Sequence, residues 1–228
     1  MWHAKKFVLI NSSMDELTRA PLWYSNNGNI ENCKINGIKC LRECKGVNIS
    51  DSTINSPEFG WRCKNVSISN SKIESMYFLF ESNNVVIDNL EFSGKYSFQY
   101  MKNLTIKNSN LDTKDVFWHS KNITVENSIV KGEYLGWFSE NLTLINCKII
   151  GTQPLCYCKN LKLINCEMID CDLSFEYSDV EASITGHITS VKNPKSGTIT
   201  ADSIGEIIKE DTVMKCKGVV VVRKKDKI

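Results

Sequence analysis

The chain has 228 residues, of which 24% are charged and 42% hydrophobic, and its formal net charge is +2. No apolar run approaches the roughly 18 residues that a membrane helix needs. Residues 1–6 lack the apolar core of a secretory signal, so we expect a cytoplasmic protein with no membrane contact. We find no compact basic stripe with interleaved aromatic residues and predict no nucleic-acid partner. The basic run from Arg223 to Lys227 is expected to be a solvated tail.

A repeat of 19 residues governs most of the chain. Its first column, from which we number the columns of every repeat, holds Asn27, Gly46, Asn65, Asn84, Asn103, Asn122, Asn141, Asn160 and Asp179. Columns two and four are mostly apolar and column three is mostly Ser or Thr, which is the alternation of a strand. Ile87 and Ile106 stand in column four and are predicted to be buried. Column six is again Asn or Asp, and column seven is mostly Ser or Cys.

The two Asn columns predict two corners of a coil, because Asn tolerates turn geometry and bonds to nearby backbone. Glycines of column eleven mark a further bend, at Gly37, Gly94, Gly132 and Gly151. A 19-residue unit with three bends has no room for a helical repeat. We therefore predict an all-β parallel β-helix of about ten coils with three short strands per coil. Its Asn side chains are expected to bond along the axis.

The repeat predicts one structural domain in two parts. Residues 1–179 form the coils, and the first coil is incomplete, because residues 2–7 match residues 118–123 column for column. Residues 180–228 keep a strand-like alternation but lose the Asn columns, so we expect degenerate last coils and a C-terminal cap. The N-terminal edge of the predicted sheet would have unpaired backbone groups. We therefore expect it to be covered, either by further coils or by a second copy of the chain in a homodimer.

The ten cysteines fall largely in repeat columns where Ser stands in other coils. Cys44 lies above Cys63, and Cys147 above Cys166. We interpret them as small buried side chains in a reducing compartment. The alternative is a vertical disulfide, since neighbouring strands lie within bridging range.

The candidate binding surface lies on the third predicted strand. Column sixteen holds Trp23, Arg42, Trp61, Phe80, Gln99, Trp118, Trp137, Cys156 and Phe175. Column eighteen is mostly Cys or Ser, like the inward column seven, and alternation then places column sixteen in the core and column seventeen outside. The alternative places column sixteen outside, where stacked aromatic rings with Arg42 and Gln99 would resemble a sugar-stacking groove.

With column seventeen outside, four consecutive coils carry an outward strip of Arg62, Glu81, Tyr100 and His119. We predict these four residues as ligand-binding, because groups at fixed intervals suit a repeating ligand such as a glycan. The three His residues do not stand near a Cys pair at metal-binding spacing, so we predict no metal and no cofactor.

Several segments are similar to an uncharacterised bacterial family, catalogued as domain of unknown function 3737 within the pectin-lyase-like superfamily. They are residues 58–61 (EFGW), 94–100 (GKYSFQY), 115–120 (DVFWHS), 132–137 (GEYLGW) and 151–158 (GTQPLCYC). The resemblance covers nearly the whole chain. It implies a right-handed β-helix in a mostly cytoplasmic setting, and it implies no activity and no catalytic residue.

Many members of that superfamily act on acidic polysaccharides, so a polysaccharide lyase or glycoside hydrolase is the alternative function. The motifs expected of a galacturonan hydrolase are absent, and the one Gly-His pair, Gly186-His187, is followed by Ile188. A lyase needs clustered carboxylates and a base, for which Asp112, Asp115 and Glu133 are the candidate acids. We rank a binding or scaffolding module above an enzyme. A flat strip would favour binding, and a concave site with converging acids would favour catalysis.

Overall fold

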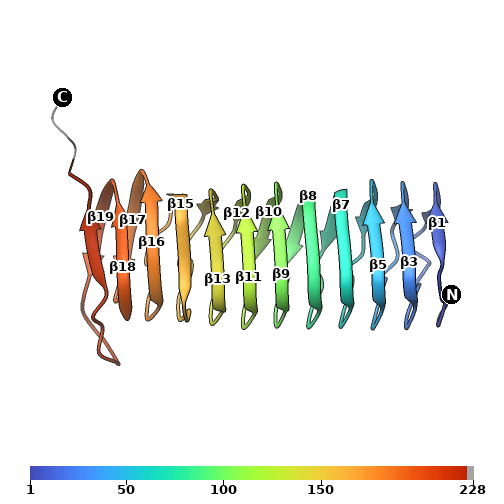
Figure 1. Ribbon diagram of the computed structural model, residues 1–228, viewed down its shortest axis with the longest axis horizontal. Coiled ribbons are helices and arrows are strands. Elements are labelled where there is room, and N and C mark those ends of the chain that lie inside the picture. The colour runs from blue at the N-terminus through green and yellow to red at the C-terminus, as the bar shows by residue number, and fades with distance from the viewer. Residues whose placement is uncertain (225–228) are drawn as a thin grey trace.

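A computed structural model describes residues 1–224 as a rod of stacked coils (Figure 1). Strands pair in parallel with the same columns of the neighbouring coil, from Asn26 opposite Lys45 to Leu163 opposite Ala182. The predicted all-β parallel solenoid with a 19-residue spacing is confirmed, with about 11 turns. The described residues contain no helix, and therefore none that could span a membrane.

Two sides of each coil are strands. The first side, columns nineteen to five, consists of β1 (Val8–Ile10), β3 (Asn26–Glu31), β5 (Lys45–Ser50), β9 (Lys102–Lys107), β11 (Lys121–Glu126) and β13 (Glu140–Ile145). The second side, columns eight to twelve, consists of β2 (Ser13–Met14), β4 (Lys34–Ile35), β6 (Thr53–Asn55), β10 (Asn110–Lys114), β12 (Ile129–Lys131) and β14 (Lys148–Ile150). In three coils both sides form one bent strand, namely β7 (Lys64–Ser75), β8 (Asn83–Lys95) and β15 (Leu161–Ile169).

The core is built from the predicted inward columns. Ile87 and Ile106 of column four are 0% exposed, and they stack directly on each other because their strands are in register. The first coil has a longer spacing, since Lys5 pairs with Asn26 and Val8 with Asn29. A homodimer across the outer edge of β1 stays a prediction.

The small inward residues link the coils by hydrogen bonds. The Ser120 hydroxyl, in column eighteen, accepts the N–H of Met101 at 2.9 Å and donates to the carbonyl of Phe98 at 2.7 Å. The Ser109 hydroxyl, in column seven, accepts the N–H of Leu90 at 3.0 Å. A hydroxyl at these positions satisfies buried backbone groups that the strand ladder leaves free.

Two exposed ladders of Asn side chains run along the rod, as the sequence predicts. In column one each side-chain N–H donates to the side-chain oxygen of the coil before, over distances of 2.8–3.1 Å from Asn84 to Asn160. We call this column, which consists of Asn65, Asn84, Asn103, Asn122, Asn141 and Asn160, the amide ladder. Its residues have positive φ, for example 58° at Asn122. This conformation favours Asn over other side chains.

The third side of the coil is not the strand that the sequence predicts. Non-glycine residues of columns fifteen and seventeen have positive φ, for example 56° at both Phe98 and Tyr100. The N–H of Phe98 bonds to Phe78 of the coil before, and that of Tyr100 to Trp118 of the coil after. The pleat is lost, because extended strands need negative φ throughout. Its two-residue alternation is lost with it.

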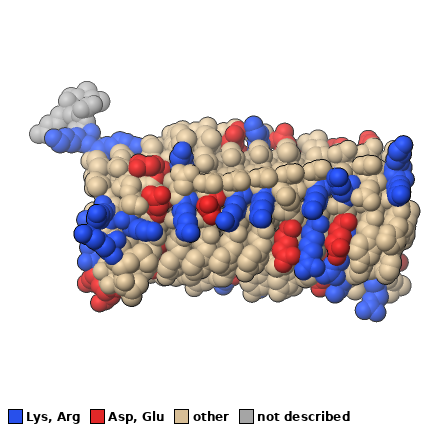
Figure 2. Space-filling view, turned by 60° about the horizontal axis from the view of Figure 1, so that its bottom comes forward, with Lys and Arg blue, Asp and Glu red and all other residues tan. Residues whose placement is uncertain are grey.

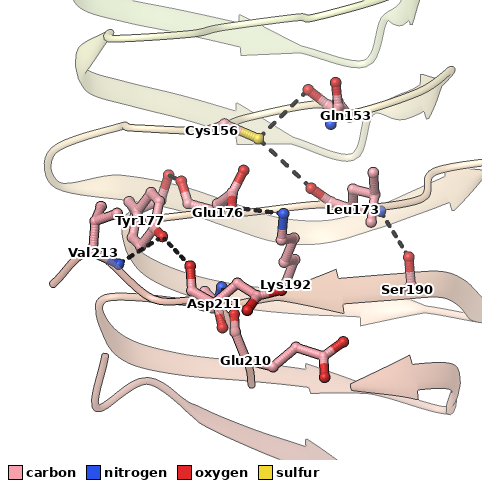
Figure 3. A network of polar contacts seen from close by, with 12 residues as sticks. Gln153, Cys156, Leu173, Glu176, Tyr177, Ser190, Lys192, Glu210, Asp211 and Val213 are labelled. Carbon is pink, nitrogen blue, oxygen red and sulfur yellow. Dashed lines mark hydrogen bonds and ion pairs between the residues drawn. The ribbon is translucent and has the colours of Figure 1, made fainter. Parts of the chain in front are cut away.

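The spacing changes beyond residue 179. There β16 (Asp179–Thr185), β18 (Ser196–Ala201) and β20 (Val219–Val222) continue the main sheet, whereas β17 (His187–Lys192) and β19 (Ser203–Ile208) form a separate pair. Figure 3 shows how the segment after β19 is held: the Tyr177 hydroxyl accepts the N–H of Val213 at 3.2 Å and donates to the carbonyl of Asp211. A capping role for this region stays a prediction.

Arg223 is not part of a solvated tail. Its guanidinium donates to the carbonyl of Ile184 and to the carboxylate of Asp202, both at 2.6 Å. The tail prediction is therefore wrong at this residue. Residues 225–228 of the tail lie outside the described residues.

Candidate functional site

The Trp residues of column sixteen lie at the surface. Trp61, Trp118 and Trp137 are half-buried, and the Trp118 and Trp137 rings are stacked, with centroids 5.6 Å apart at an interplanar angle of 5°. The preferred prediction that this column fills the core is wrong for its Trp residues, whereas Gln99, Cys156 and Phe175 of the same column are buried. Column fifteen takes the inward position, where Phe117 is 1% exposed.

A repeated hydrogen bond fixes these side chains. The indole N–H of Trp118 donates to the carbonyl of Tyr134, sixteen residues on, at 2.6 Å. The same bond is made by Trp23, Trp61 and Trp137. Gln99 replaces Trp in this column and donates its amide N–H to the carbonyl of Asp115 at 2.9 Å. The polar end of each side chain is thus satisfied by backbone, and its position is set by the next coil.

Column seventeen lies outside, as predicted. Arg62, Glu81, Tyr100 and His119 are all exposed and stand on four consecutive coils. Arg62 bonds to Glu81 at 2.7 Å, and Tyr100 stacks on His119 with centroids 5.2 Å apart. We call the outward side chains of columns sixteen and seventeen, together with Tyr177 at their end, the aromatic strip. The four candidate residues are brought together in this strip, and their role in binding stays a prediction.

The rings of the aromatic strip turn their edges to solvent along part of the rod. His119 lies between Tyr100 and Phe138 with centroid distances of 5.2 and 4.8 Å and angles of 10° and 4°, and Phe138 stacks in turn on Tyr157 at 4.8 Å. Because each face in this run is covered by the next ring, a sugar or base has no free face to stack on there. The alternative of a sugar-stacking groove concerned column sixteen and not this run, and it stays a prediction.

Arg42 interrupts the aromatic column. Its guanidinium lies 5.1 Å from the ring of Trp23 and 4.8 Å from that of Trp61, on neighbouring coils. Such cation–π contacts hold the group in place. Within residues 1–224 the half-buried Arg42 has no ion pair.

A row of lysines beside the aromatic strip was missed by the sequence analysis. Column nineteen, which starts the first side of each coil, holds Lys5, Asn26, Lys45, Lys64, Asn83, Lys102, Lys121, Glu140 and Lys159, in register on successive coils. We call its six lysines the lysine row. Figure 2 shows basic side chains lined up along the rod. The signal was present in the sequence as a column, whereas we had looked for a compact cluster.

The candidate acids do not converge in a cavity. Asp112 pairs with Lys131 at 2.9 Å on the second side of the coil. Glu133 pairs with Lys114 at 2.5 Å beside Asp115, which is 6% exposed. Burial raises the pKa of Asp115, Lys114 opposes this shift, and Glu133 adds to it. Asp115 and Glu133 therefore form an acidic pair just after the strands of the second side, outside the aromatic strip.

A shallow cavity of about 340 Å³ lies where β17 leaves the main sheet, lined by Glu167, Asp170, His187 and neighbouring residues. Glu167 is paired with Lys148 at 3.4 Å, and His187 contacts the Ser203 hydroxyl at 2.9 Å. Within residues 1–224 no group of three or more His, Cys, Asp or Glu could hold a metal ion.

The cysteines are free thiols, and all but Cys216 are buried. Burial raises the pKa of Cys158 to about 11 and that of Cys171 to about 12. A raised pKa keeps a thiol protonated at neutral pH and makes it a poor nucleophile. Cys158 and Cys171 therefore serve packing. The pKa values of Cys44 and Cys147 are instead lowered, chiefly by hydrogen bonds with Cys63 and Cys166, but both of these thiols are also buried.

The chain belongs to a family described as "Protein of unknown function (DUF3737)", whose model matches residues 1–222. The predicted family is thus confirmed. No curated protein matches the sequence.

Solved β-helix structures resemble the fold. A surface adhesin of Streptococcus pneumoniae, PfbA, matches at a TM-score of 0.51 and 11% identity, over 91% of this chain and 62% of that one. The chain thus spans less than two thirds of that protein's length. A mutant of the periplasmic alginate epimerase AlgG matches at a TM-score of 0.33 and 9% identity, over 96% of this chain and 76% of that one. A family 28 exopolygalacturonase of Yersinia enterocolitica matches at a TM-score of 0.28 and 10% identity, over 89% of this chain and 47% of that one. At these identities the likeness concerns the fold alone.

Proposed function

We propose that the protein is a binding module that holds an extended ligand against the aromatic strip without cleaving it. The supporting observation is the pre-organised strip itself. Its Trp side chains are tied to backbone carbonyls at 2.6–2.8 Å, and its rings brace one another. A surface that is rigid before binding loses little conformational entropy when a ligand docks.

The strip also has the composition of a recognition surface. Trp, Tyr and Arg dominate the energetics of many interfaces, because they combine large apolar area with directed polar groups. Tyr100 and Phe138 are 47% and 42% exposed although both are large and apolar. The ligand class in view is a carbohydrate polymer, whose repeating units would meet like residues on successive coils.

The test is binding to a panel of immobilised neutral and acidic polysaccharides. We expect the double variant Tyr100→Ser/Phe138→Ser to weaken binding by about tenfold or more, as the loss of two exposed anchors would. The control is Val86→Ser, because Val86 is 54% exposed on the first side and outside the strip. The proposal fails if no polymer in the panel binds, or if the strip variant binds as well as the wild type.

The alternative function, a polysaccharide lyase or hydrolase, is tested by measuring the chain length of the same polysaccharides after incubation with the protein. The acidic pair Asp115 and Glu133 is the group that would carry it, because a carboxyl with a raised pKa is a candidate general acid. Incubated polymers should keep their length under our proposal. Chain shortening that Glu133→Gln abolishes would establish the enzyme and contradict the binding module.

A further inference from the structure

We propose that the ligand is an anionic polysaccharide that lies along the lysine row, with its acidic groups on the lysines and its hydroxyls on the amide ladder. This inference rests on the proposed function, because it names the ligand of the same lateral face. It is carried by three features of that face: the sign of its charges, the hydrogen-bonding capacity of the adjoining column, and the covered ring faces of the strip.

The lysine row places like charges one above another. Lys45 is in register with Lys64, and Lys102 with Lys121, and all four are exposed. Like charges directly opposite each other on neighbouring strands repel. Within residues 1–224 only Lys121 of the row has an ion pair, with Glu140 at 2.8 Å. Lys159 lies opposite Glu140 and also interacts with its carboxylate. Lys5, Lys45, Lys64 and Lys102 remain available to an anion.

The rest of the rod surface is arranged differently. Most of its ion pairs join in-register residues of opposite sign on successive coils, such as Lys72 with Glu91, Lys107 with Glu126, and Lys148 with Glu167. Such vertical pairs neutralise those columns. The acids of the proposed face are Glu140 in the row, Asp179 in column one, and Glu43, Glu81 and Glu176 in column seventeen. Glu81 is bonded to Arg62, Glu176 to Lys192, and Asp179 to the hydroxyl of Ser196. The row therefore keeps a surplus of positive charge.

The amide ladder stands directly beside the lysine row, since column one follows column nineteen. A side-chain amide has two N–H donors and two acceptor lone pairs on its oxygen. In the middle of the ladder, Asn122 uses one N–H on Asn103 and one lone pair for Asn141. One donor and one acceptor are left for solvent or for a hydroxyl. Neighbouring rungs lie about 4.8 Å apart, the spacing of neighbouring strands. Asn103 differs from Asn122 in that it also donates to Asn83, at 3.2 Å.

Covered ring faces favour a polysaccharide over a single-stranded nucleic acid. Proteins that bind single strands without sequence preference rely on aromatic faces on which bases stack. Here Tyr100, His119, Phe138 and Tyr157 use their faces on one another. What the surface offers is positive charge, amide groups and ring edges, and these fit carboxylates and hydroxyls.

The experiment uses the full chain and four probes: polygalacturonate, alginate, neutral dextran and poly(dT). We expect both polyuronates to bind and dextran to bind at least about tenfold more weakly, with affinity that falls as salt rises, because bound cations are displaced from the polymer. The double variant Lys45→Gln/Lys64→Gln should weaken polyuronate binding and flatten its salt dependence. The matched control is Lys34→Gln/Lys162→Gln, which removes the same charge from exposed lysines outside the row and should leave binding unchanged.

Each other result counts against the inference in a distinct way. Tighter binding of poly(dT) than of either polyuronate would identify a nucleic-acid surface instead. Equal loss in the row and control variants would show only a general charge effect. If the row variant binds normally while Tyr100→Ser/Phe138→Ser does not, the inference fails and the binding module stands. If no polymer binds, both fail.

Discussion

At the scale of single residues, the recurring Ser and Cys of the inward columns act as connectors. Their position was visible in the sequence, because Ser and Cys replace each other in columns seven and eighteen. Their role was not, because it depends on the backbone of the neighbouring coil. The hydroxyl of Ser120 serves one donor and one acceptor of that backbone.

We predict that Ser120→Ala lowers the free energy of unfolding by about 1–3 kcal/mol, because it leaves the N–H of Met101 and the carbonyl of Phe98 without this hydrogen-bond partner in the core. Ser120→Cys should cost less, since Cys63 already occupies the same column in another coil. Urea unfolding of the two variants checks this. Equal stability of the Ala variant and the wild type would show that the Ser hydroxyl does not contribute.

A second residue-scale prediction concerns Asp115, whose folded-state pKa is raised above that of the unfolded chain, chiefly by burial. Such a group contributes stability that is present below the unfolded pKa and is lost as the pH rises through the folded pKa. Asp115→Asn should therefore be more stable than the wild type at pH 7. The difference should shrink as the pH falls toward 4. Thermal melts from pH 3.5 to 7.5 measure it, and a difference that grows on acidification would contradict the assignment.

At the scale of elements, the two strand sides were predictable and the third side was not. Alternating apolar residues between two Asn corners are typical of a pleated strand. Both features recur in most coils, so the sequence alone predicts these two sides. The third side carries bulky residues such as Phe98 and Tyr100 at positive φ, where their propensities predict a strand. The one sequence signal was glycine in column fifteen, where Gly60 and Gly136 have φ of 77° and 73°.

The corner of column one gives an element-scale prediction. Asn122→Gly keeps the left-handed backbone and loses the ladder bonds, whereas Asn122→Ala loses both. The left-handed conformation costs a residue with a Cβ roughly 1–2 kcal/mol, which exceeds the roughly 0.4–1 kcal/mol that Ala gains over Gly through the unfolded state. We expect the Ala variant to be the less stable of the two in urea unfolding. The reverse order would show that the left-handed backbone does not decide which residue this corner accepts.

At the scale of the whole molecule, the rod encloses nearly all of its thiols. Nine of the ten cysteines are buried and Cys216 is partly exposed. Alkylation of the folded protein followed by mass spectrometry should therefore add one label, and alkylation in denaturant should add ten. Several labels on the folded protein would mean that the coils open readily. A mass loss that indicates a disulfide in freshly lysed cells would contradict the predicted reducing compartment.

Because the register is strictly 19 residues, a middle coil can be removed or inserted as a whole unit. Removal of residues 103–121 joins Lys102 to Asn122 and leaves every column aligned, because Lys102 and Lys121 are already partners across the sheet. The product should fold as a rod about 4.8 Å shorter, measurable by small-angle scattering. Removal of 18 residues instead would turn every following side chain to the wrong face. The length of this protein can thus change in whole steps without altering the fold, and under the proposed binding role the number of ligand units that it contacts would change with it.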